Sequence, residues 1–186
     1  MGGHPKALLP WHGETFLEGI LKACRAAGIQ RRVVVLGHHA DLIQDAVPLD
    51  EVMVVRSEAL DAGPIGSIRS GLKAVSPHPV SGVLLWPVDR PHVQIATVEA
   101  LQSAFRDGEA PIVVPRFDGH RGHPVIFGRS VFHELEVAPD NEGARAVVHR
   151  DPARVMAVDV PDPAVIEDVN TPDEYQDLVR RTEAAE

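Results

Sequence analysis

The chain has 186 residues, 44% of them hydrophobic, and a formal net charge of −9 at pH 7. This is enough apolar sequence to build the core of one domain without disulfides or metals as cross-links. The 18 lysines and arginines are dispersed, which excludes a nucleic-acid binder because phosphate neutralisation needs a clustered basic surface.

The first half of the chain alternates helical and strand periods. An apolar face over residues 16–27 predicts a helix, with Thr15 as its N-cap and Gly28 at its end. The same patterns then predict strands over 33–37, 52–55 and 82–89 and helices over 40–47, 64–75 and 95–106. This alternation is typical of βαβ units around a largely parallel sheet.

The second half is less regular. Strands are expected over 110–117 and 123–128, paired across a polar connection that contains glycines, and a late strand over 154–160. A helix is expected from EGARAVVHRD (142–151), and a terminal one from TPDEYQDLVRRT (171–182), with Thr171 as N-cap and Pro172 at the first position. We therefore predict one domain over 1–186, with a Rossmann-like three-layer α/β/α fold and a hairpin inserted near 115–128.

Cysteine usage and hydropathy bear on the cellular setting. Cys24 is the only cysteine, which excludes a disulfide framework, and its helical context indicates a small buried hydrophobe. No apolar stretch approaches the roughly 20 residues that span a bilayer, and no signal-peptide pattern follows Met1. We expect a soluble, cytoplasmic protein without a membrane partner.

Two glycine-bearing stretches are candidates for anion binding. In GGHPK, Gly2 and Gly3 let backbone amides converge on an anion and Lys6 supplies a mobile charge, although a plain tail with a surface lysine explains the stretch equally well. In GPIGSIRSGL, glycines and serines lead into a helix start with free N–H groups, where Arg69 could clamp an oxyanion; ordinary turn and capping chemistry is the alternative. The candidate residues of this second stretch are Gly63, Pro64, Gly66, Ser67, Ser70 and Gly71.

Asp89 follows an apolar strand directly, in LLWPVDRPHV. Open α/β sheets bind ligands at the carboxyl ends of their strands, and Mg²⁺ takes one or two carboxylates while water and phosphates fill its other positions. Asn170, in EDVNTPDEY, would add a neutral oxygen beside Asp89. Pairing of Asp89 with Arg90, and helix capping around Asn170 and Asp168, remain open as structural explanations.

Ten histidines invite a zinc hypothesis, which their spacing does not support. His38 and His39 are adjacent and point apart in an extended segment, and His120 with His123 lacks a second ligand pair at a recognisable spacing. A structural metal site is not expected. His123, in GHRGHPVIF, is a candidate polar contact beside a ligand.

Taken in order, these stretches resemble the MobA-like nucleotidyltransferases, and most closely the molybdenum-cofactor cytidylyltransferases. That family opens with LAAGxSxRMGxPK followed by LLP, and this chain enters the pattern at its end, with Gly2, Gly3, Pro5, Lys6 and ALLP. The family's first strand and the glycine-rich half of its loop are therefore absent from the chain. Removing that strand would leave two neighbouring strands with unpaired backbone groups, so we expect a partner strand, a swapped segment or a rearranged sheet to fill its position.

The resemblance continues along nearly the whole chain and implies roles for particular residues. GSIRSGL (66–72) matches the family's second nucleotide-contacting segment, PVDRP (87–91) its metal-binding aspartate, RGHPVIF (121–127) its acceptor-side segment, EGARAVV (142–148) the following helix and DVNTPDEY (168–175) its closing metal-site motif. The match implies Mg²⁺ on Asp89 and Asn170, phosphate contacts from Lys6, and acceptor contacts from Arg121 and His123. Asn170 stands where the family often has a second aspartate.

The implied reaction is attack by the terminal phosphate of an acceptor on the α-phosphorus of a nucleoside triphosphate, with release of pyrophosphate. CTP is the favoured donor, with GTP as the alternative, and the acceptor is a molybdopterin-type phosphate; a molybdoenzyme is a further implied partner. Guanylyl or sugar-phosphate transfer is a second reading. A non-catalytic cofactor-binding module is a third, because the phosphate loop is truncated.

Overall fold

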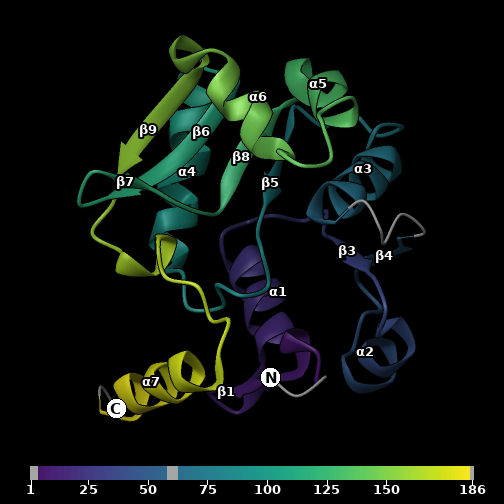
Figure 1. Cartoon of the computed structure of the whole chain (residues 1–186), viewed down its shortest axis with the longest axis vertical. Coiled ribbons are helices and arrows are strands. Elements are labelled where there is room, and N and C mark those ends of the chain that lie inside the picture. The colour runs from purple at the N-terminus through teal and green to yellow at the C-terminus, as the bar shows by residue number, and fades with distance from the viewer. Residues whose placement is uncertain (1–3, 58–62, 185–186) are drawn as a thin grey trace.

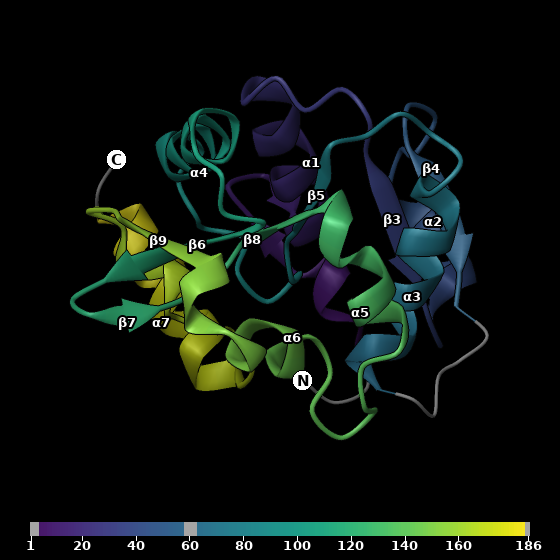
Figure 2. The same cartoon turned by 90° about the horizontal axis from the view of Figure 1, so that it is seen from above.

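The structure, a computed structural model, describes residues 4–57 and 63–184. Its helices lie on both faces of the strands, so that three layers form. Seen from above, α1 (Phe16–Ala26) and α4 (Ile95–Asp107) cover one side, and α3 (Pro64–Val75), α5 (Phe132–Glu136) and α6 (Ala144–Arg150) cover the other (Figure 2). The Rossmann-like three-layer prediction is confirmed.

The larger sheet is mixed. Its strands are β5 (Gly82–Leu85), β8 (Val125–Gly128), β6 (Ile112–Phe117) and β9 (Val155–Asp159), hydrogen-bonded in that order, with the short β7 (His120–Arg121) also paired to β6. β9 is parallel to β6, whereas β8 is antiparallel to both β5 and β6. As a result β5, β6 and β9 run in the same direction, and only β8 among these four opposes them.

The smaller sheet consists of β3 (Val33–Leu36) and β4 (Met53–Arg56), which are parallel. Between them the chain forms α2 (Ala40–Ala46) (Figure 1). In the ranges 4–57 and 63–184 no strand is hydrogen-bonded to both sheets, so they remain separate ladders.

The strands of the larger sheet are continuous apolar runs in the sequence because both faces of this sheet are buried. In β6, Ile112 and Val114 pack with α3 and α5 in the largest core cluster, whereas Val113 packs with Leu101 of α4 on the opposite face. All of these side chains are at most 2% exposed. Because successive strand residues point to opposite faces, alternate residues of one strand fill two cores.

The helix ends follow the sequence signals. Thr15 caps α1 and Thr171 caps α7 (Pro172–Glu183), each in a reciprocal pair with a glutamate three residues later. Gly28, with a φ of +78°, ends α1 as expected, and its amide and that of Ile29 bond back to the last turn.

Three differences from the expected elements stand out. The β1 (Pro10–Trp11) and β2 (Glu14–Thr15) hairpin and the helix α5 were not expected, because each is too short to show a period. The late helix begins at Ala144 rather than near Glu142. The segment expected as an inserted hairpin supplies β8, which lies between β5 and β6 inside the main sheet.

Within the described part of the chain, no helix is both long and apolar enough to cross a membrane.

Candidate active site

Segments far apart in the sequence meet beyond the carboxyl end of β5. These are the N-terminal segment around Lys6, the loop after β5, and residues 165–170, which lead into α7. Figure 1 shows that the chain runs from β5 toward the end of the molecule where α7 and the start of α1 also lie. The amide of Val169 donates to the carbonyl of Asp89 at 2.8 Å, which joins two of the segments directly.

Lys6 lies between the two candidate cation ligands. It begins a short 3₁₀ helix (Lys6–Leu8), and its Nζ donates a hydrogen bond to Oδ1 of Asn170, 164 residues away in sequence. The same Nζ lies 3.9 Å from Oδ2 of Asp89. The structure therefore brings Lys6, Asp89 and Asn170 together.

Asp89 has one oxygen that is available to a ligand. Its Oδ1 is buried and has no hydrogen-bond partner within the residues that the structure describes. Burial raises the pKa of this carboxyl, as does the nearby Asp168, whereas Lys6 and Arg90 oppose the shift. An unsatisfied buried carboxylate oxygen is costly unless a cation or a donor compensates it, so the site fits a hard divalent cation.

Asp168 is engaged by an arginine. It forms an ion pair with Arg90, whose side chain is only 11% exposed and also donates to the carbonyl of Val165. The alternative considered above, a pair between Asp89 and Arg90, is not what forms. The ion pair with Arg90 thus fixes the carboxylate of Asp168 beside the site.

Asn170 is fixed by the start of α7. The backbone amides of Asn170 and Thr171 both donate to Oε2 of Glu174, at 2.7 and 2.8 Å, and Thr171 Oγ1 accepts from the amide of Glu174. These bonds use the backbone of Asn170 and leave its carboxamide oxygen to Lys6. Helix capping and a ligand role for Asn170 are therefore compatible.

His123 approaches from the β7–β8 connection. Its amide donates to the carbonyl of Val165 at 2.8 Å, and its Nδ1 is buried without a hydrogen-bond partner in the described residues. Burial and the charge of Arg90 lower the pKa of His123 to about 4, against an opposing effect of Asp168. The ring is therefore neutral at pH 7. Arg121 lies in β7, and its side chain is exposed.

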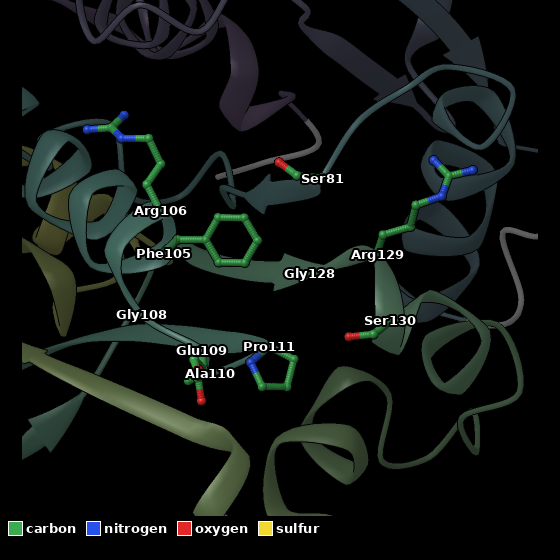
Figure 3. A pocket seen from close by; sticks show the side chains of 10 residues that line it. All are labelled: Ser81, Phe105, Arg106, Gly108, Glu109, Ala110, Pro111, Gly128, Arg129 and Ser130. Carbon is green, nitrogen blue, oxygen red and sulfur yellow. The ribbon is translucent and has the colours of Figure 1, made fainter.

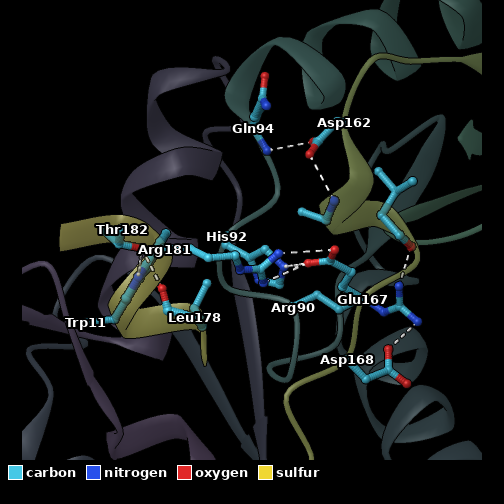
Figure 4. Close-up of polar contacts among 12 residues, drawn as sticks. Trp11, Arg90, His92, Gln94, Asp162, Glu167, Asp168, Leu178, Arg181 and Thr182 are labelled. Carbon is cyan, nitrogen blue, oxygen red and sulfur yellow. Dashed lines mark hydrogen bonds and ion pairs between the residues drawn. The ribbon is translucent and has the colours of Figure 1, made fainter. Parts of the chain in front are cut away.

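A second polar cluster, not anticipated from the sequence, lies beside this site (Figure 4). Glu167 contacts His92 at 3.3 Å and Arg181 of α7 at 2.9 Å. Burial lowers the pKa of His92, although Glu167 opposes that shift. Trp11 lies against His92 and donates to Thr182, so α7 is tied to the loop after β5. The sequence did not indicate this cluster, because its members are far apart along the chain and no single motif contains them.

The glycine- and serine-rich stretch forms the start of α3 as expected. Gly63 is its N-cap, with a φ of +64°, and Pro64 is its first residue. Ser70 Oγ donates to the carbonyl of Gly66 at 3.0 Å and to Ser57. Gly66 is buried in the first turn, while Ser67, in the same turn, is half-buried.

Two other residues of that stretch have packing roles. A Cβ on Gly71 would lie 3.3 Å from Val35, so this glycine lets α3 pack closely on β3. Arg69 was considered as an oxyanion clamp, but it binds the carbonyls of Glu136 and Ala138 and the carboxylate of Asp140. Its charge is used to fix the end of α5. The candidates Gly2 and Gly3 lie outside the described residues.

One hollow on the surface lies away from this site. A depression of about 570 Å³ is lined by residues that include Phe105, Arg106, Pro111 and Arg129, at the amino ends of β5 and β6 (Figure 3). This is the edge of the sheet opposite to Asp89. Arg129 binds carbonyls of the segment after α3, at Ser76 and His78. None of the expected site residues lines this hollow.

The cation donors are few. Among the residues that the structure describes, no group of three or more His, Cys, Asp or Glu side chains could hold a metal ion. The candidate ligands Asp89 and Asn170 would supply one carboxylate and one amide oxygen. Mg²⁺ is commonly bound by one or two protein carboxylates together with water and substrate phosphates, so a small donor set suits it.

Comparisons with known proteins agree with the expected family and fold. A family model described as the MobA-like NTP transferase domain matches residues 1–162. Nicotine blue oxidoreductase of Paenarthrobacter nicotinovorans is 27% identical, over 96% of this chain and 90% of that protein.

Solved structures extend the comparison. Rv0371c of Mycobacterium tuberculosis is 34% identical with a TM-score of 0.79, covering 96% of this chain and 90% of that one. Its complex with manganese is 33% identical with a TM-score of 0.78, covering 96% and 93%. Molybdopterin-guanine dinucleotide biosynthesis protein A of Archaeoglobus fulgidus, 18% identical with a TM-score of 0.70 and covering 98% and 92%, shows the shared fold.

Proposed function

Because the chain belongs to the MobA-like NTP transferase family, we propose that it transfers CMP from CTP to a molybdopterin-type phosphate acceptor and releases pyrophosphate. The observation that carries this proposal is the meeting of Lys6, Asp89 and Asn170 at the carboxyl end of β5. This edge of an α/β sheet is where such folds bind ligands.

Asp89 and Asn170 are the residues that would hold Mg²⁺ or Mn²⁺. Asp89 offers its unpartnered Oδ1, and Asn170 offers a carboxamide oxygen held in place by the cap of α7. A divalent cation at this position would neutralise phosphate charge. The manganese complex of the related Rv0371c supports a divalent metal in this family.

Lys6 supplies the positive charge for the phosphates. Its side chain is 27% exposed and its ammonium sits on a flexible stem, so it can turn from Asn170 toward a bound triphosphate. Phosphoryl-type transfer depends mainly on positioning and charge neutralisation, so no covalent nucleophile is required. Gly63, Gly66, Ser67 and Ser70 at the start of α3 line the proposed nucleotide side, where free helix amides favour anions.

His123 and Arg121 form the proposed acceptor side. His123 is neutral at pH 7, and its buried Nδ1 has no hydrogen-bond partner among the described residues. This nitrogen suits a directed hydrogen bond with the acceptor substrate. Arg121 adds an exposed charge on the same connection and suits a phosphate. The proposed acceptor therefore approaches over the β7–β8 connection.

The test is pyrophosphate release from CTP or GTP, with Mg²⁺ or Mn²⁺ and with reduced molybdenum cofactor as acceptor. We expect release with CTP that requires both cation and acceptor, and a loss of about 10²-fold or more in Asp89→Asn, because the carboxylate that would hold the phosphate-neutralising cation is removed. Asp159→Asn is the matched control, since Asp159 is an exposed carboxylate paired with Arg116 on β9.

The same assay separates the alternatives. Release with GTP, or with a sugar phosphate as acceptor, would replace the proposed donor or acceptor while keeping the reaction class. Cofactor binding without any release would favour a binding module and overturn the catalytic proposal. The assay is needed because members of one family carry different activities, as the name of the relative from Paenarthrobacter illustrates.

A further inference from the structure

Arg90 is the most buried charged side chain next to the candidate cation ligand. It directly follows Asp89, and its side chain is only 11% exposed. A guanidinium is rarely buried unless its donors are satisfied. Here one side of the fork pairs with Asp168 and the other donates to the carbonyl of Val165 (Figure 4).

These contacts join two loops that carry the candidate ligands. Asp89 lies on the loop after β5, and Asn170 lies at the end of the segment that begins at Val165. The backbone bond from Val169 to Asp89 completes the link, and the carbonyl of Arg90 accepts from Trp86 Nε1 at 2.9 Å. The buried side chain of Arg90 therefore connects the loop after β5 to the segment 165–170.

Arg90 also separates two carboxylates. Asp89 and Asp168 are close enough that Asp168 raises the pKa of Asp89. Like charges at short range destabilise one another unless a cation compensates them. Arg90 forms an ion pair with Asp168, whereas Asp89 lies 3.9 Å from Nζ of Lys6, so the two carboxylates have different cationic partners.

We propose that Arg90 is a positioning residue, which sets the placement of Asn170 relative to Asp89 by clamping Asp168 and the Val165 carbonyl. In this role Asp168 is the partner of Arg90 and also accepts a 3.5 Å hydrogen bond from Nδ2 of Asn170, and it does not itself contact cation or phosphate. The expected effect on divalent-cation binding rests on the proposed function. The expected effect on the contact between the two loops does not.

The first measurement needs no metal. Amide hydrogen exchange of Val169, followed by NMR, reports the bond between the two loops. Arg90→Gln is expected to accelerate exchange of Val169 by about tenfold or more, because the segment loses its internal clamp. Arg181→Gln is the matched control: Arg181 holds the neighbouring Glu167 from the exposed surface of α7, and its loss should leave Val169 nearly unchanged.

The second measurement is the affinity for Mn²⁺, titrated by electron paramagnetic resonance without nucleotide. Loss of a group that orients a metal ligand typically lowers affinity by about 10- to 100-fold, and we expect this range for Arg90→Gln. Arg90→Lys should recover part of it, since a lysine can pair with Asp168 but cannot bond the Val165 carbonyl at the same time. Asp168→Asn should resemble Arg90→Gln, and the double variant should be no weaker than either one.

The outcomes are distinguishable. Unchanged exchange at Val169 in Arg90→Gln overturns the inference, whatever the metal does. A far larger loss of Mn²⁺ affinity in Asp168→Asn than in Arg90→Gln, additive in the double variant, also overturns it, because Asp168 would then be a direct ligand. If the unaltered protein binds no Mn²⁺, the proposed function fails while the exchange measurement still decides the role of Arg90. Should Arg90→Gln fail to fold, Arg90→Lys and Asp168→Asn carry the same comparison.

Discussion

Lys6 shares its binding partners with the proposed cation. Its Nζ is bonded to the oxygen of Asn170 and lies 3.9 Å from Asp89, the two residues proposed to hold the metal. An ammonium and a divalent cation cannot occupy the same oxygens at close range without repulsion. Metal binding should therefore require Lys6 to leave these oxygens, which frees its ammonium for the phosphates of a bound nucleotide.

This geometry predicts opposite effects of Lys6→Met on binding and on turnover. Mn²⁺ affinity measured without nucleotide should rise by about three- to tenfold, because the substitution removes one partly exposed positive charge that competes with the cation. Pyrophosphate release should fall, because the phosphates lose their lysine. Isothermal titration with Mn²⁺ beside the activity assay checks both. Lys22→Met serves as control, since Lys22 pairs with Glu14 at the surface; weaker Mn²⁺ binding in Lys6→Met would show that Lys6 supports the metal instead.

His123 predicts a pH effect with a definite sign. Its pKa in the folded protein is about 4, below the ordinary 6.5, so as pH falls the unfolded chain takes up the proton first. Stability should therefore be complete above about pH 6.5 and decline as the pH drops toward 4. NMR titration of the His123 ring in the folded protein should give a midpoint near 4; a midpoint near 6.5 would mean that burial does not hold the ring neutral.

At the scale of elements, the close approach of the β7–β8 connection to residues 165–170 determines the shape of the site. Gly122 lies where this approach is tightest: a Cβ there would be 1.9 Å from the carbonyl oxygen of Val165. The same carbonyl accepts from the amide of His123 and from Arg90. Only a glycine at position 122 leaves room for both donors to reach this backbone oxygen.

Gly122→Ala should consequently destabilise the fold and disturb the site together. The contact involves backbone atoms that cannot rotate away, so we expect a loss of about 2 kcal/mol or more in the free energy of unfolding, within the range for overpacked positions. Gly19→Ala, in the middle of α1 where a Cβ meets nothing within 4 Å, should instead gain about 0.5–1 kcal/mol. Urea unfolding of both variants checks this; equal small effects would show that the 165–170 segment yields easily.

Local signals explain which elements were predictable. Thr15 and Thr171, with a glutamate three residues later, identify helix starts from sequence alone because the whole capping interaction lies within one turn. The place of β8 between β5 and β6 was not predictable, since strand order depends on contacts among distant residues. For the same reason Asp89 and Asn170 could be suspected from their motifs, whereas the pairing of Arg90 with Asp168 could not.

At the scale of the whole molecule, the alternating helix and strand pattern predicts the three layers. It does not predict that the strands of the two sheets differ in hydrogen bonding and burial. β6 is hydrogen-bonded on both sides, by β8 and β9, and Ile112 and Val113 are fully buried. Among the strands of residues 4–57 and 63–184, β3 is paired with β4 alone, and the residues of β4 are half-buried or exposed. Val34, Leu36 and Ile43 belong to a separate core cluster near α1 and α2.

This difference predicts that the β3–β4 unit opens before the larger sheet. A two-stranded ladder with its own small cluster has a lower free energy of local opening than a strand paired on both sides within the main core. Native-state hydrogen exchange, read by mass spectrometry, should show faster exchange in peptides covering 33–36 and 53–56 than in those covering 112–117 and 125–128. The ratio should shrink in denaturant as global unfolding takes over. Equal protection in native buffer would mean that α3, which packs on β3 through Gly71 and Val35, couples the two sheets into one cooperative unit.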